Sequence, residues 1–208
     1  RIRISSIEPT TIPSPLLERM AARDHPLVPF LHIPVQSGSD RVLSLMKRKY
    51  SRSDFLQFVN NAAKQVPNIC IGTDILVGFP SESDQDFADT KSLLTDAPLA
   101  YAHVFTYSER RNTAASRIVP VVDSATMDKR SLELRLLSQK KRAEFYKRFL
   151  QEKARVLFES EEGGFWHGHT DNYIPVISEW KNGKPNLVKS VHLEKVCGDV
   201  VLGSVIDD

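Results

Sequence analysis

The sequence predicts an α/β protein that ends in a small all-β unit. Over residues 1–107, short apolar segments alternate with amphipathic helices, which is the pattern of parallel strands joined by right-handed helical crossovers. From residue 151 onward, short alternating runs are separated by turn signals, as in a five-stranded β-barrel. For the α/β part, a barrel and an open doubly wound sheet both fit the pattern.

Four strands are expected in the α/β part. The first alternates charged and apolar residues, and the third is the most apolar stretch of the chain. No G-x-G-x-x-G motif follows any of them, which disfavours a dinucleotide site. The expected strands span residues 1–7, 30–35, 69–79 and 101–107.

Helices follow the first three strands, and serines that can act as N-caps precede them. The clearest helix begins after Ser51, because Asp54 lies three residues later in a capping-box position and Pro67 ends the helix. The expected helices cover residues 16–22, 39–46, 51–66 and a segment that begins after Ser83, with Ser14 and Ser39 capping the first two.

A long basic helix, roughly over residues 125–150, is expected to connect the two parts after a loop at 108–123. Its inner face is expected to hold Leu132, Leu136, Ala143, Tyr146 and Leu150. We therefore divide the chain into an α/β domain at 1–123, a linking helix at 124–150 and a β domain at 151–208.

The charge of the chain is unevenly distributed. Its 28 basic and 26 acidic residues leave a net charge of +2, but residues 124–155 carry ten basic and four acidic groups while residues 156–208 carry four and nine. A basic segment can be a footprint for a polyanion, or simply a solvated helix face. The candidate RNA-binding residues on this helix are Lys140, Lys141, Arg142, Lys147 and Arg148.

Several classes of protein are excluded or disfavoured. No apolar run approaches the ~18 residues that cross a bilayer, so no membrane association is expected. Cys70 and Cys197 are too few and too far apart for a disulfide scaffold, a zinc ribbon or an iron–sulfur binding run, and a reduced, cytoplasmic setting is expected. The chain begins directly in an expected strand at Arg1, so we expect it to be a piece of a longer protein.

Polar residues follow each expected strand, where ligands bind to parallel sheets and barrels. Such a cluster predicts a cleft for a polar ligand with a flat ring: an amide and hydroxyls can bond ribose, a glycine admits a ring, and an aromatic side chain can stack on it. Caps and turns are the alternative explanation. The residues concerned are Ser5, Ser6, Glu8, Gln36, Ser37, Gly38, Gly78, Phe79, Glu82, Tyr107 and Ser108.

Two further groups of residues are singled out. Asp74 lies within an apolar strand and needs polar partners there, whereas His32 and His103 are interpreted as core residues. In the β domain, aromatic, amide and hydroxyl groups suit RNA, although an acidic unit alone is a poor phosphate binder and needs the basic helix beside it. These candidates are His169, Thr170, Asn172 and Tyr173.

Taken in order, these segments resemble the radical S-adenosylmethionine methylthiotransferase family. The matching motifs are R-I-S-S-I-E-P (3–9), H-I-P-V-Q-S-G-S-D (32–40), M-K-R-K-Y (46–50), G-T-D-I-L-V-G-F-P (72–80) and H-V-F-T-Y-S (103–108). The segment G-H-T-D-N-Y-I-P-V (168–176) resembles the RNA-binding TRAM domain of those enzymes. Within the family, the chain is most similar to the branch that methylthiolates N6-threonylcarbamoyladenosine beside the anticodon of tRNA.

The resemblance implies a fold and a set of cofactors. The fold is a (β/α)6 partial TIM-like barrel, of which this chain holds strands three to six, followed by a small antiparallel β-barrel, the TRAM domain. The cofactors are S-adenosylmethionine and two 4Fe–4S clusters, whose ligands would lie outside this chain, so the chain alone should be inactive. Contact with S-adenosylmethionine is expected from Ser6, Gln36, Ser37, Gly78, Phe79 and Tyr107, with Glu8 and Asp74 as further candidates.

Two departures and several alternatives go with the resemblance. Ser81 replaces a glycine of the family pattern, and residues 109–112 depart from it. The expected partner is tRNA, while the sulfur donor and the oligomeric state are left open. The alternatives are action on isopentenyladenosine in tRNA, action on a ribosomal protein, and a non-catalytic RNA-binding module.

Overall fold

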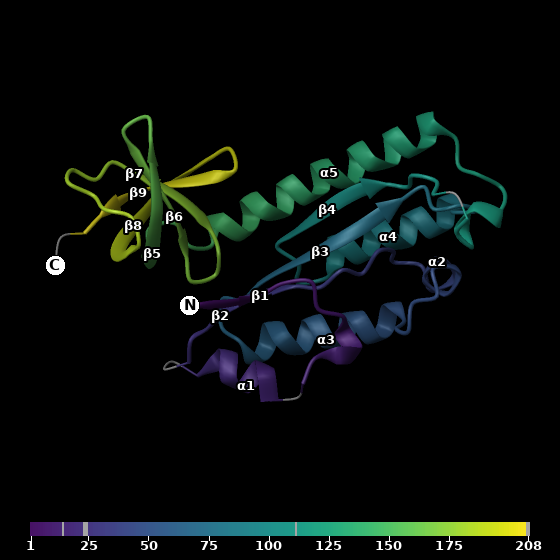
Figure 1. Ribbon diagram of the computed structural model, residues 1–208, viewed down its shortest axis with the longest axis horizontal. Helices are drawn as coiled ribbons and strands as arrows, with labels where there is room; N and C mark the ends of the chain where they lie inside the picture. The colour runs from purple at the N-terminus through teal and green to yellow at the C-terminus, as the bar shows by residue number, and fades with distance from the viewer. Residues whose placement is uncertain (14, 23–24, 111, 207–208) are drawn as a thin grey trace.

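The computed structural model describes all residues except 14, 23–24, 111 and 207–208. Its first part is a four-stranded parallel sheet in the order β1-β2-β3-β4, with helices packed against it (Figure 1). The strands are β1 (Ile2–Ile4), β2 (Leu27–His32), β3 (Cys70–Val77) and β4 (Tyr101–Thr106). The α/β fold class and the parallel strands predicted from the sequence are confirmed.

The helices that join these strands are α1 (Pro15–Ala21), α2 (Asp40–Leu45), α3 (Arg52–Gln65) and α4 (Asp84–Asp96), with a short 3-10 turn η1 (Pro9–Thr11) before α1. A second 3-10 turn, η2 (Ala115–Arg117), follows β4. Ser39, Ser51 and Ser83 cap α2, α3 and α4 through their hydroxyls, as expected. The expected cap Ser14 lies outside the described residues. Leu31, Ile71, Val59 and Leu93 are among the buried residues of the core between sheet and helices.

The bounds of β1 and β2 differ most from the expectation. β2 begins three residues early, at Leu27, because its first residues pair with β1 even though Pro29 lies among them. After His32 the chain continues beside β3 to Gln36, whose backbone exchanges hydrogen bonds with Asp74 and Leu76. β1 is shorter than expected and ends at Ile4.

Helix α5 (Ser124–Lys147) covers the outer edge of β4, and its inner face differs from the expected one. Ser138 Oγ accepts from the Ala102 amide and donates to the Ala102 carbonyl, both at 2.8 Å. Leu132 and Leu136 are 60% and 57% exposed, so their predicted burial is wrong. A hydroxyl takes the place of a neighbouring strand at this edge, and such polar inner residues are invisible to a search for an apolar stripe.

The second part is a closed barrel of five strands in the order β5-β6-β7-β9-β8. The strands are β5 (Lys153–Glu162), β6 (Phe165–Thr170), β7 (Pro175–Ser178), β8 (Leu187–Cys197) and β9 (Val200–Val205). The expectation of an antiparallel barrel needs one correction, because β7 and β9 pair in parallel while the other four pairs are antiparallel.

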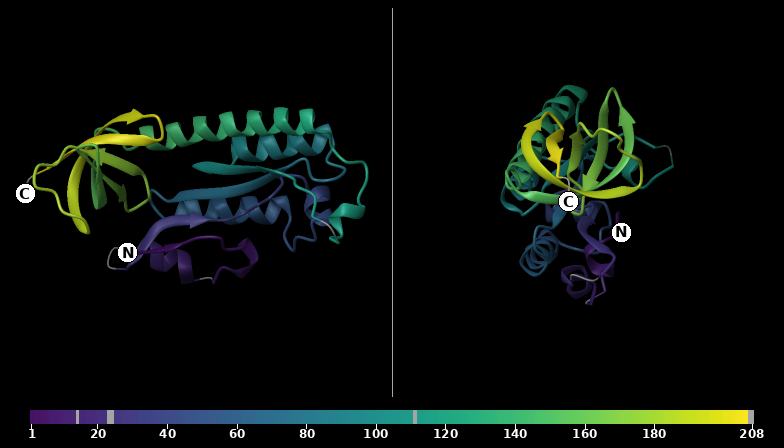
Figure 2. Two further views of the ribbon diagram at one scale, coloured as in Figure 1. Left: turned by 45° about the horizontal axis from the view of Figure 1, so that its top comes forward. Right: turned by 90° about the vertical axis from the view of Figure 1, so that its left-hand side faces the viewer.

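The small barrel packs against the amino ends of the sheet strands, and we call this contact the joint. Figure 1 and the left-hand view of Figure 2 place the barrel beyond those ends, while the strand arrows point away from it. Val28, Phe30 and Cys70 of the sheet share one apolar cluster with Phe158 and Ile174 of the barrel. None of the described helices is both long enough and apolar enough to cross a membrane.

Candidate functional site

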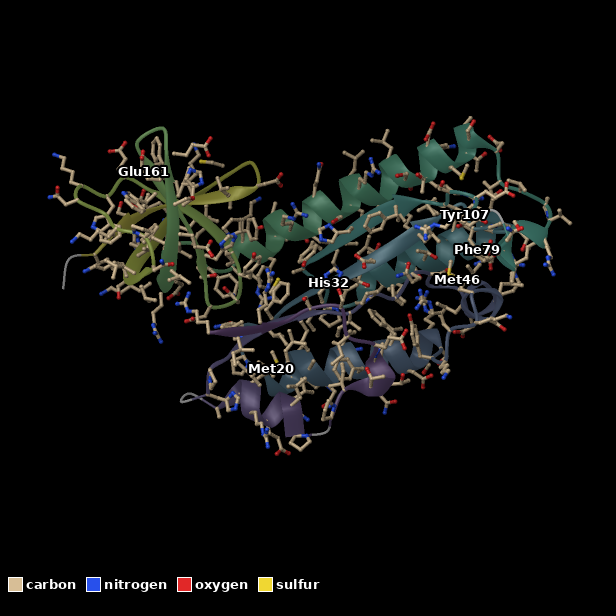
Figure 3. The ribbon with its side chains drawn as sticks, in the orientation of Figure 1. Met20, His32, Met46, Phe79, Tyr107 and Glu161 are labelled. Atoms are coloured by element: carbon tan, nitrogen blue, oxygen red, sulfur yellow. The ribbon has the colours of Figure 1, made fainter. Side chains whose placement is uncertain are left out.

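Five of the eight expected cofactor residues gather at the carboxyl ends of the strands, which we call the rim: Gln36, Ser37, Gly78, Phe79 and Tyr107. Gln36 bridges to Ile75 on one side of β3, and the Tyr107 amide donates to the Val77 carbonyl on the other side at 2.8 Å. Phe79 and Tyr107 lie at the end of the molecule away from the small barrel (Figure 3). His32 lies between the small barrel and these two residues. Residues from separate segments therefore meet at one end of the sheet.

Two rim groups have hydrogen-bonding capacity left over. The Tyr107 hydroxyl is buried and has no hydrogen-bond partner among the described residues. Gln36 is partly buried with φ 70, and no hydrogen bond within the described part of the chain engages its side-chain amide. Because a buried polar group without a partner is costly, this hydroxyl fits a bound polar molecule such as the ribose or carboxylate of S-adenosylmethionine.

The turn after β3 is held by a buried ion pair. Glu82 Oε2 accepts from the Gly78 amide at 2.7 Å, and Glu82 Oε1 accepts from Arg130 of α5 at 2.9 Å. Arg130 also donates to Asp84 at 2.7 Å. Burial raises the pKa of Glu82, and the bonds from Gly78 and Arg130 oppose that rise. The long linking helix thus fixes the conformation of the rim.

Gly78 and Phe79 serve packing in this structure. Gly78 has φ 77, and a Cβ on it would lie 2.2 Å from Cγ of Met127, so the space the glycine leaves is taken by α5. Phe79 is buried and packs edge-on against Tyr107 with ring centroids 5.6 Å apart. The glycine admits the side chain of Met127 here, whereas the sequence predicts that it admits a ligand ring.

Ser37 is buried in a network that ties two rim turns together. Its hydroxyl lies 3.2 Å from that of Thr90. Nearby, Asp86 accepts from Ser39 at 2.5 Å, from the Ser83 amide at 2.8 Å and from Arg41. Burial alone would raise the pKa of Asp86, but these hydrogen bonds lower it well below the ordinary value. The starts of α2 and α4 are therefore clamped by one carboxylate.

The remaining expected cofactor residues lie away from Gln36 and Tyr107. Glu8 pairs with Arg48 at 3.2 Å, and Ser6 is exposed with φ 57 just after β1. Asp74 lies midway along β3. Ser6 and Asp74 line a separate cavity, described next.

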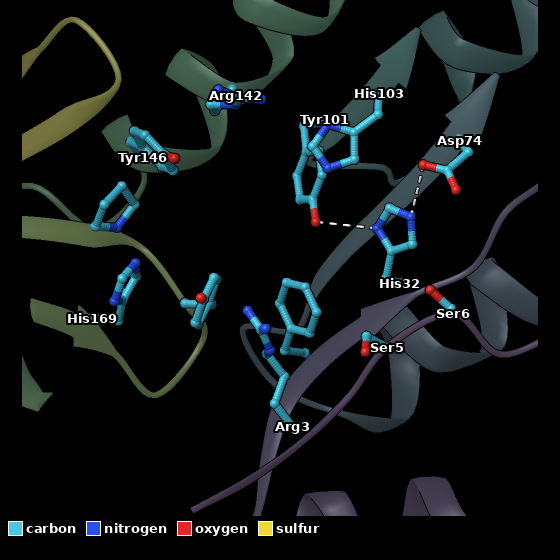
Figure 4. Close-up of a pocket in the computed structure, with 13 residues that line it drawn as sticks. Arg3, Ser5, Ser6, His32, Asp74, Tyr101, His103, Arg142, Tyr146 and His169 are labelled. Atoms are coloured by element: carbon cyan, nitrogen blue, oxygen red, sulfur yellow. Dashed lines mark hydrogen bonds and ion pairs between the residues drawn. The ribbon is translucent and has the colours of Figure 1, made fainter. Parts of the chain in front are cut away.

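A cavity of about 480 Å³ lies at the joint, and we call it the joint cavity (Figure 4). It combines residues from the inner face of the sheet, from α5 and from the barrel. Three expected RNA-binding residues, Arg142, His169 and Tyr173, reach it together with the two expected cofactor residues. Its lining consists of Arg3, Ser5, Ser6, Phe30, His32, Asp74, Tyr101, His103, Arg142, Tyr146, His169, Tyr173 and Pro175.

The sheet side of the joint cavity carries a hydrogen-bonded chain of polar groups. His32 Nε2 lies 2.9 Å from Asp74 Oδ1, and His32 Nδ1 lies 3.3 Å from the Tyr101 hydroxyl. The His103 ring is 5.4 Å from that of His32, and burial and His32 lower the pKa of His103. The interpretation of both histidines as core residues is therefore incomplete, because both side chains line a cavity.

The barrel side contains a three-layer stack. The rings of His169 and Tyr173 are parallel within 10° at 4.2 Å, and the Arg3 guanidinium carbon lies 3.9 Å from the Tyr173 centroid. Two groups this close cannot share one face of the ring, so Tyr173 lies between them. Its faces are used by the protein, which leaves the ring edge as the part that can meet another molecule.

The other expected RNA-binding residues of the barrel also serve the joint. Thr170 and Asn172 are buried and hydrogen bonded to each other at 2.6 Å, and Asn172 donates to the Asn68 carbonyl at 3.1 Å. Arg1 adds bonds to the His169 carbonyl and an ion pair with Asp171 at 2.8 Å. This loop attaches the barrel to the sheet.

The basic residues of the linking helix fall into two groups. Lys147 and Arg148 are exposed, as is Lys140, which has only a 3.9 Å pair with Glu144. By contrast, Lys141 donates to the Thr95 and Ala97 carbonyls beside the end of α4, and burial lowers its pKa. Arg142 faces the joint cavity and pairs with Asp199 at 3.2 Å.

Sequence reasoning gives no site role to seven residues that line the joint cavity: Arg3, Phe30, His32, Tyr101, His103, Tyr146 and Pro175. A signal for four of them is present in the sequence. Phe30 and His32, and likewise Tyr101 and His103, are two residues apart in their strands, so each pair points to the same face of the sheet. Polar and aromatic residues repeating at that spacing indicate a lined cavity.

Within the described residues, no group of three or more His, Cys, Asp or Glu side chains could hold a metal ion. Cys70 is buried beneath the joint, where burial raises its pKa to about 12, and Cys197 is exposed in the barrel. The described residues therefore offer no set of ligands for an iron–sulfur cluster.

Comparison with known proteins gives consistent results. Residues 1–94 match the family model of the radical SAM superfamily. The threonylcarbamoyladenosine tRNA methylthiotransferase MtaB of Aquifex aeolicus is 36% identical over 178 residues, covering 86% of this chain and 42% of that protein. The tRNA-2-methylthio-N(6)-dimethylallyladenosine synthase of Chloroherpeton thalassium is 38% identical, with coverages of 88% and 41%.

Among solved structures, coproporphyrinogen III oxidase from Escherichia coli, a radical SAM enzyme, aligns with a TM-score of 0.49 at 18% identity, covering 77% of this chain and 34% of that one. This chain spans about two-fifths of the length of the curated relatives it matches.

Proposed function

Because this chain belongs to the radical S-adenosylmethionine superfamily, within its methylthiotransferase family, we propose that it is the C-terminal part of a tRNA methylthiotransferase. The longer protein would add a methylthio group to C2 of N6-threonylcarbamoyladenosine next to the anticodon. The observation that carries the proposal is the 36% identity to MtaB over 86% of the chain. We also propose that the small barrel is a TRAM domain and binds RNA.

The rim is where this chain would hold S-adenosylmethionine. When bound beside a reducing cluster, that cofactor supplies a deoxyadenosyl radical. The Gln36 amide and the Tyr107 hydroxyl have hydrogen-bonding capacity to orient it, and Glu82 with Arg130 keeps the adjoining turn in place. The cluster ligands would lie in the rest of the protein, so the 208-residue chain alone should be inactive and bind S-adenosylmethionine weakly.

The exposed basic residues of α5 would contact tRNA. Lys140, Lys147 and Arg148 are exposed on the helix that carries most of the excess positive charge. For each phosphate that a variant no longer neutralises, the slope of log affinity against log salt should fall by about 0.9 for a duplex and about 0.7 for a single strand. Replacing Lys147 and Arg148 with Gln should therefore weaken tRNA binding and flatten its salt dependence.

The substrate can be tested in cells. A strain lacking the gene should lose 2-methylthio-N6-threonylcarbamoyladenosine, as measured by mass spectrometry of tRNA nucleosides, and the intact gene should restore it. Complementation by a Tyr107→Phe gene, which removes only the hydroxyl, should restore less of the modification. Unchanged methylthio-threonylcarbamoyladenosine in the deletion strain would refute the assignment.

A second substrate is favoured by one observation. The synthase that acts on dimethylallyladenosine in Chloroherpeton thalassium is 38% identical, which is close to the value for MtaB. The same nucleoside analysis separates the two, because this alternative predicts loss of the methylthio group from the isopentenyl nucleoside and none from the threonylcarbamoyl nucleoside.

A further inference from the structure

We propose that the joint cavity binds a single nucleotide, a nucleoside 5′-monophosphate unit whose base carries an exocyclic amino group. The cavity combines a carboxylate, aromatic walls and two guanidinium groups, contributed by three separate parts of the fold (Figure 4). Those are the groups that recognise the amino edge of a base, its flat ring and its phosphate.

The size and position of the joint cavity set it apart from the rim. Its volume of about 480 Å³ falls in the range of small-molecule sites, roughly 300–1,000 Å³, and exceeds what one nucleotide needs. Asp74 lies four residues before Gly78 on β3, which is about 13 Å along the strand. A nucleotide here is therefore a ligand separate from a cofactor held at the rim.

The carboxylate of Asp74 provides base selectivity. One of its oxygens is bonded to His32, and no hydrogen bond within the described residues engages the other. An ionised carboxylate only accepts hydrogen bonds, so it suits the amino groups of adenine, cytosine and guanine. Uracil presents a carbonyl oxygen at the corresponding position, which the carboxylate would repel.

The walls beside Asp74 are aromatic and can pack on a base. The rings of Tyr101 and His103 are 5.1 Å apart, and both line the cavity. Tyr101 lies across Gly72, where a Cβ would come within 2.3 Å of the tyrosine ring, so the glycine lets that ring lie against the sheet. The lowered pKa of His103 favours an uncharged imidazole near neutral pH.

Two arginines border the cavity on different sides. Arg3 forms no ion pair with a carboxylate among the described residues and is held on the Tyr173 ring at 3.9 Å. Arg142 comes from α5, with its guanidinium carbon 5.4 Å from the Tyr101 centroid and an exposed partner in Asp199. Guanidinium groups bind phosphate bidentately, and stacking on a ring keeps Arg3 in position to do so.

Two sources fit this chemistry, a free nucleotide and a nucleotide within an RNA strand. The choice of RNA as the source rests on the proposed function, whereas the binding site itself does not. If RNA supplies it, the cavity holds an unstacked nucleotide other than the one that is modified, because the rim is about 13 Å away along β3. Reading such a neighbour would contribute to the choice of tRNA.

The test uses the 208-residue chain and calorimetric titration with adenosine and uridine 5′-monophosphates. Adenosine monophosphate should bind about tenfold more tightly than uridine monophosphate, since one charge-assisted hydrogen bond differs. Arg3→Gln and Arg142→Gln should each weaken adenosine monophosphate binding about tenfold. The matched control Arg19→Gln, on the exposed face of α1, should bind like the wild type.

Asp74→Asn should change the affinities for the two nucleotides in opposite directions, which a general loosening of the joint would not do. Asparagine can donate a hydrogen bond to a uracil carbonyl, so this variant should bind uridine monophosphate more tightly and adenosine monophosphate more weakly. Thermal melting by circular dichroism shows whether each variant is folded. Equal affinity of the wild type for the two nucleotides, or no binding of either at millimolar concentration, would overturn the proposal.

A single-stranded adenosine trinucleotide distinguishes the two sources. If the trinucleotide binds more tightly than adenosine monophosphate, and Arg142→Gln abolishes that gain, the natural ligand is RNA. If the trinucleotide binds more weakly, the natural ligand is a free nucleotide. Either result supports the site. The cellular nucleoside analysis tests the methylthiotransferase function separately, so each proposal can fail without the other.

Discussion

The rim and the joint lie at opposite ends of the same parallel sheet, but different interactions hold them. At the rim, buried charges are paired and hydrogen bonded: Glu82 with Arg130, and Asp86 with Ser39 and Ser83. At the joint, Tyr173 lies stacked between other side chains while remaining 37% exposed.

This difference has consequences for mobility and function. Buried ion pairs are costly to break and hold one geometry, whereas half-exposed stacking is weaker and can rearrange. The comparison therefore predicts a rigid end for the chemistry of the cofactor and a more adaptable end where the barrel meets the sheet.

The largest effect is expected from Arg130→Ala. The change would leave Glu82 buried with only the Gly78 amide and part of the turn to stabilise its charge. Losing one member of a buried pair costs about 3–5 kcal/mol in unfolding free energy. Urea denaturation measures this, with Arg117→Ala, an exposed arginine, as the control. A loss below about 1 kcal/mol would contradict the rigid rim, given how strongly buried pairs usually respond.

A smaller, pH-dependent effect is expected from Asp86→Asn. The folded-state pKa of Asp86 is depressed, so its contribution to stability is present above the unfolded value and is lost as the pH falls. At pH 7 the variant should be about 2 kcal/mol less stable, the scale of hydrogen bonds to a charged group. Below about pH 4, where an unfolded aspartate is protonated, the difference should shrink.

Denaturation curves of wild type and Asp86→Asn from pH 7 to pH 3 provide this measurement. The pKa of Glu82 is raised, unlike that of Asp86, so its contribution to the free energy of unfolding changes with pH in the opposite direction. The stability it favours is present below its unfolded pKa and is lost as the pH rises through its folded pKa. A constant gap between wild type and Asp86→Asn across the range would rule out the carboxylate clamp.

At the joint, Tyr173→Ala should have a moderate effect. It removes the ring between His169 and Arg3 together with its contact to Phe30 at 5.2 Å. Aromatic and cation–π contacts at partly exposed sites contribute about 1–2 kcal/mol in total. Tyr173→Phe keeps the ring and should behave like the wild type. Thermal melting and protease cleavage near residues 148–152 measure the weakened joint, and equal losses in both variants would show that stacking is not what matters.

The smallest expected effect is the difference in stability between variants of two neighbouring lysines on α5, the helix that runs between the two regions. Lys140→Gln should change stability by less than about 0.5 kcal/mol, because its pair with Glu144 is exposed. Lys141→Gln should cost about 1 kcal/mol, because two carbonyls near the end of α4 lose a donor. The order is read from parallel melting curves, and a reversed order would contradict the burial of Lys141.

Local rules predicted much of the helical architecture correctly. Ser51 and Asp54 form both bonds of a capping box, and Ser83 does the same with Asp86, because a cap depends on residues only three apart. The inner face of α5 could not be predicted in that way. It is set by the open edge of β4, where Ser138 bonds the backbone of a strand 36 residues away.

The candidate sites divide along the same line. By itself, the sequence determined that Gln36, Gly78 and Tyr107 lie at one end of a sheet, because parallel strands place the residues that follow them at a common edge. Only the tertiary structure decided that Tyr173 faces Arg3, since nothing local relates the orientation of a barrel to that of a sheet. That relation arises when the two parts pack and bury a shared apolar cluster.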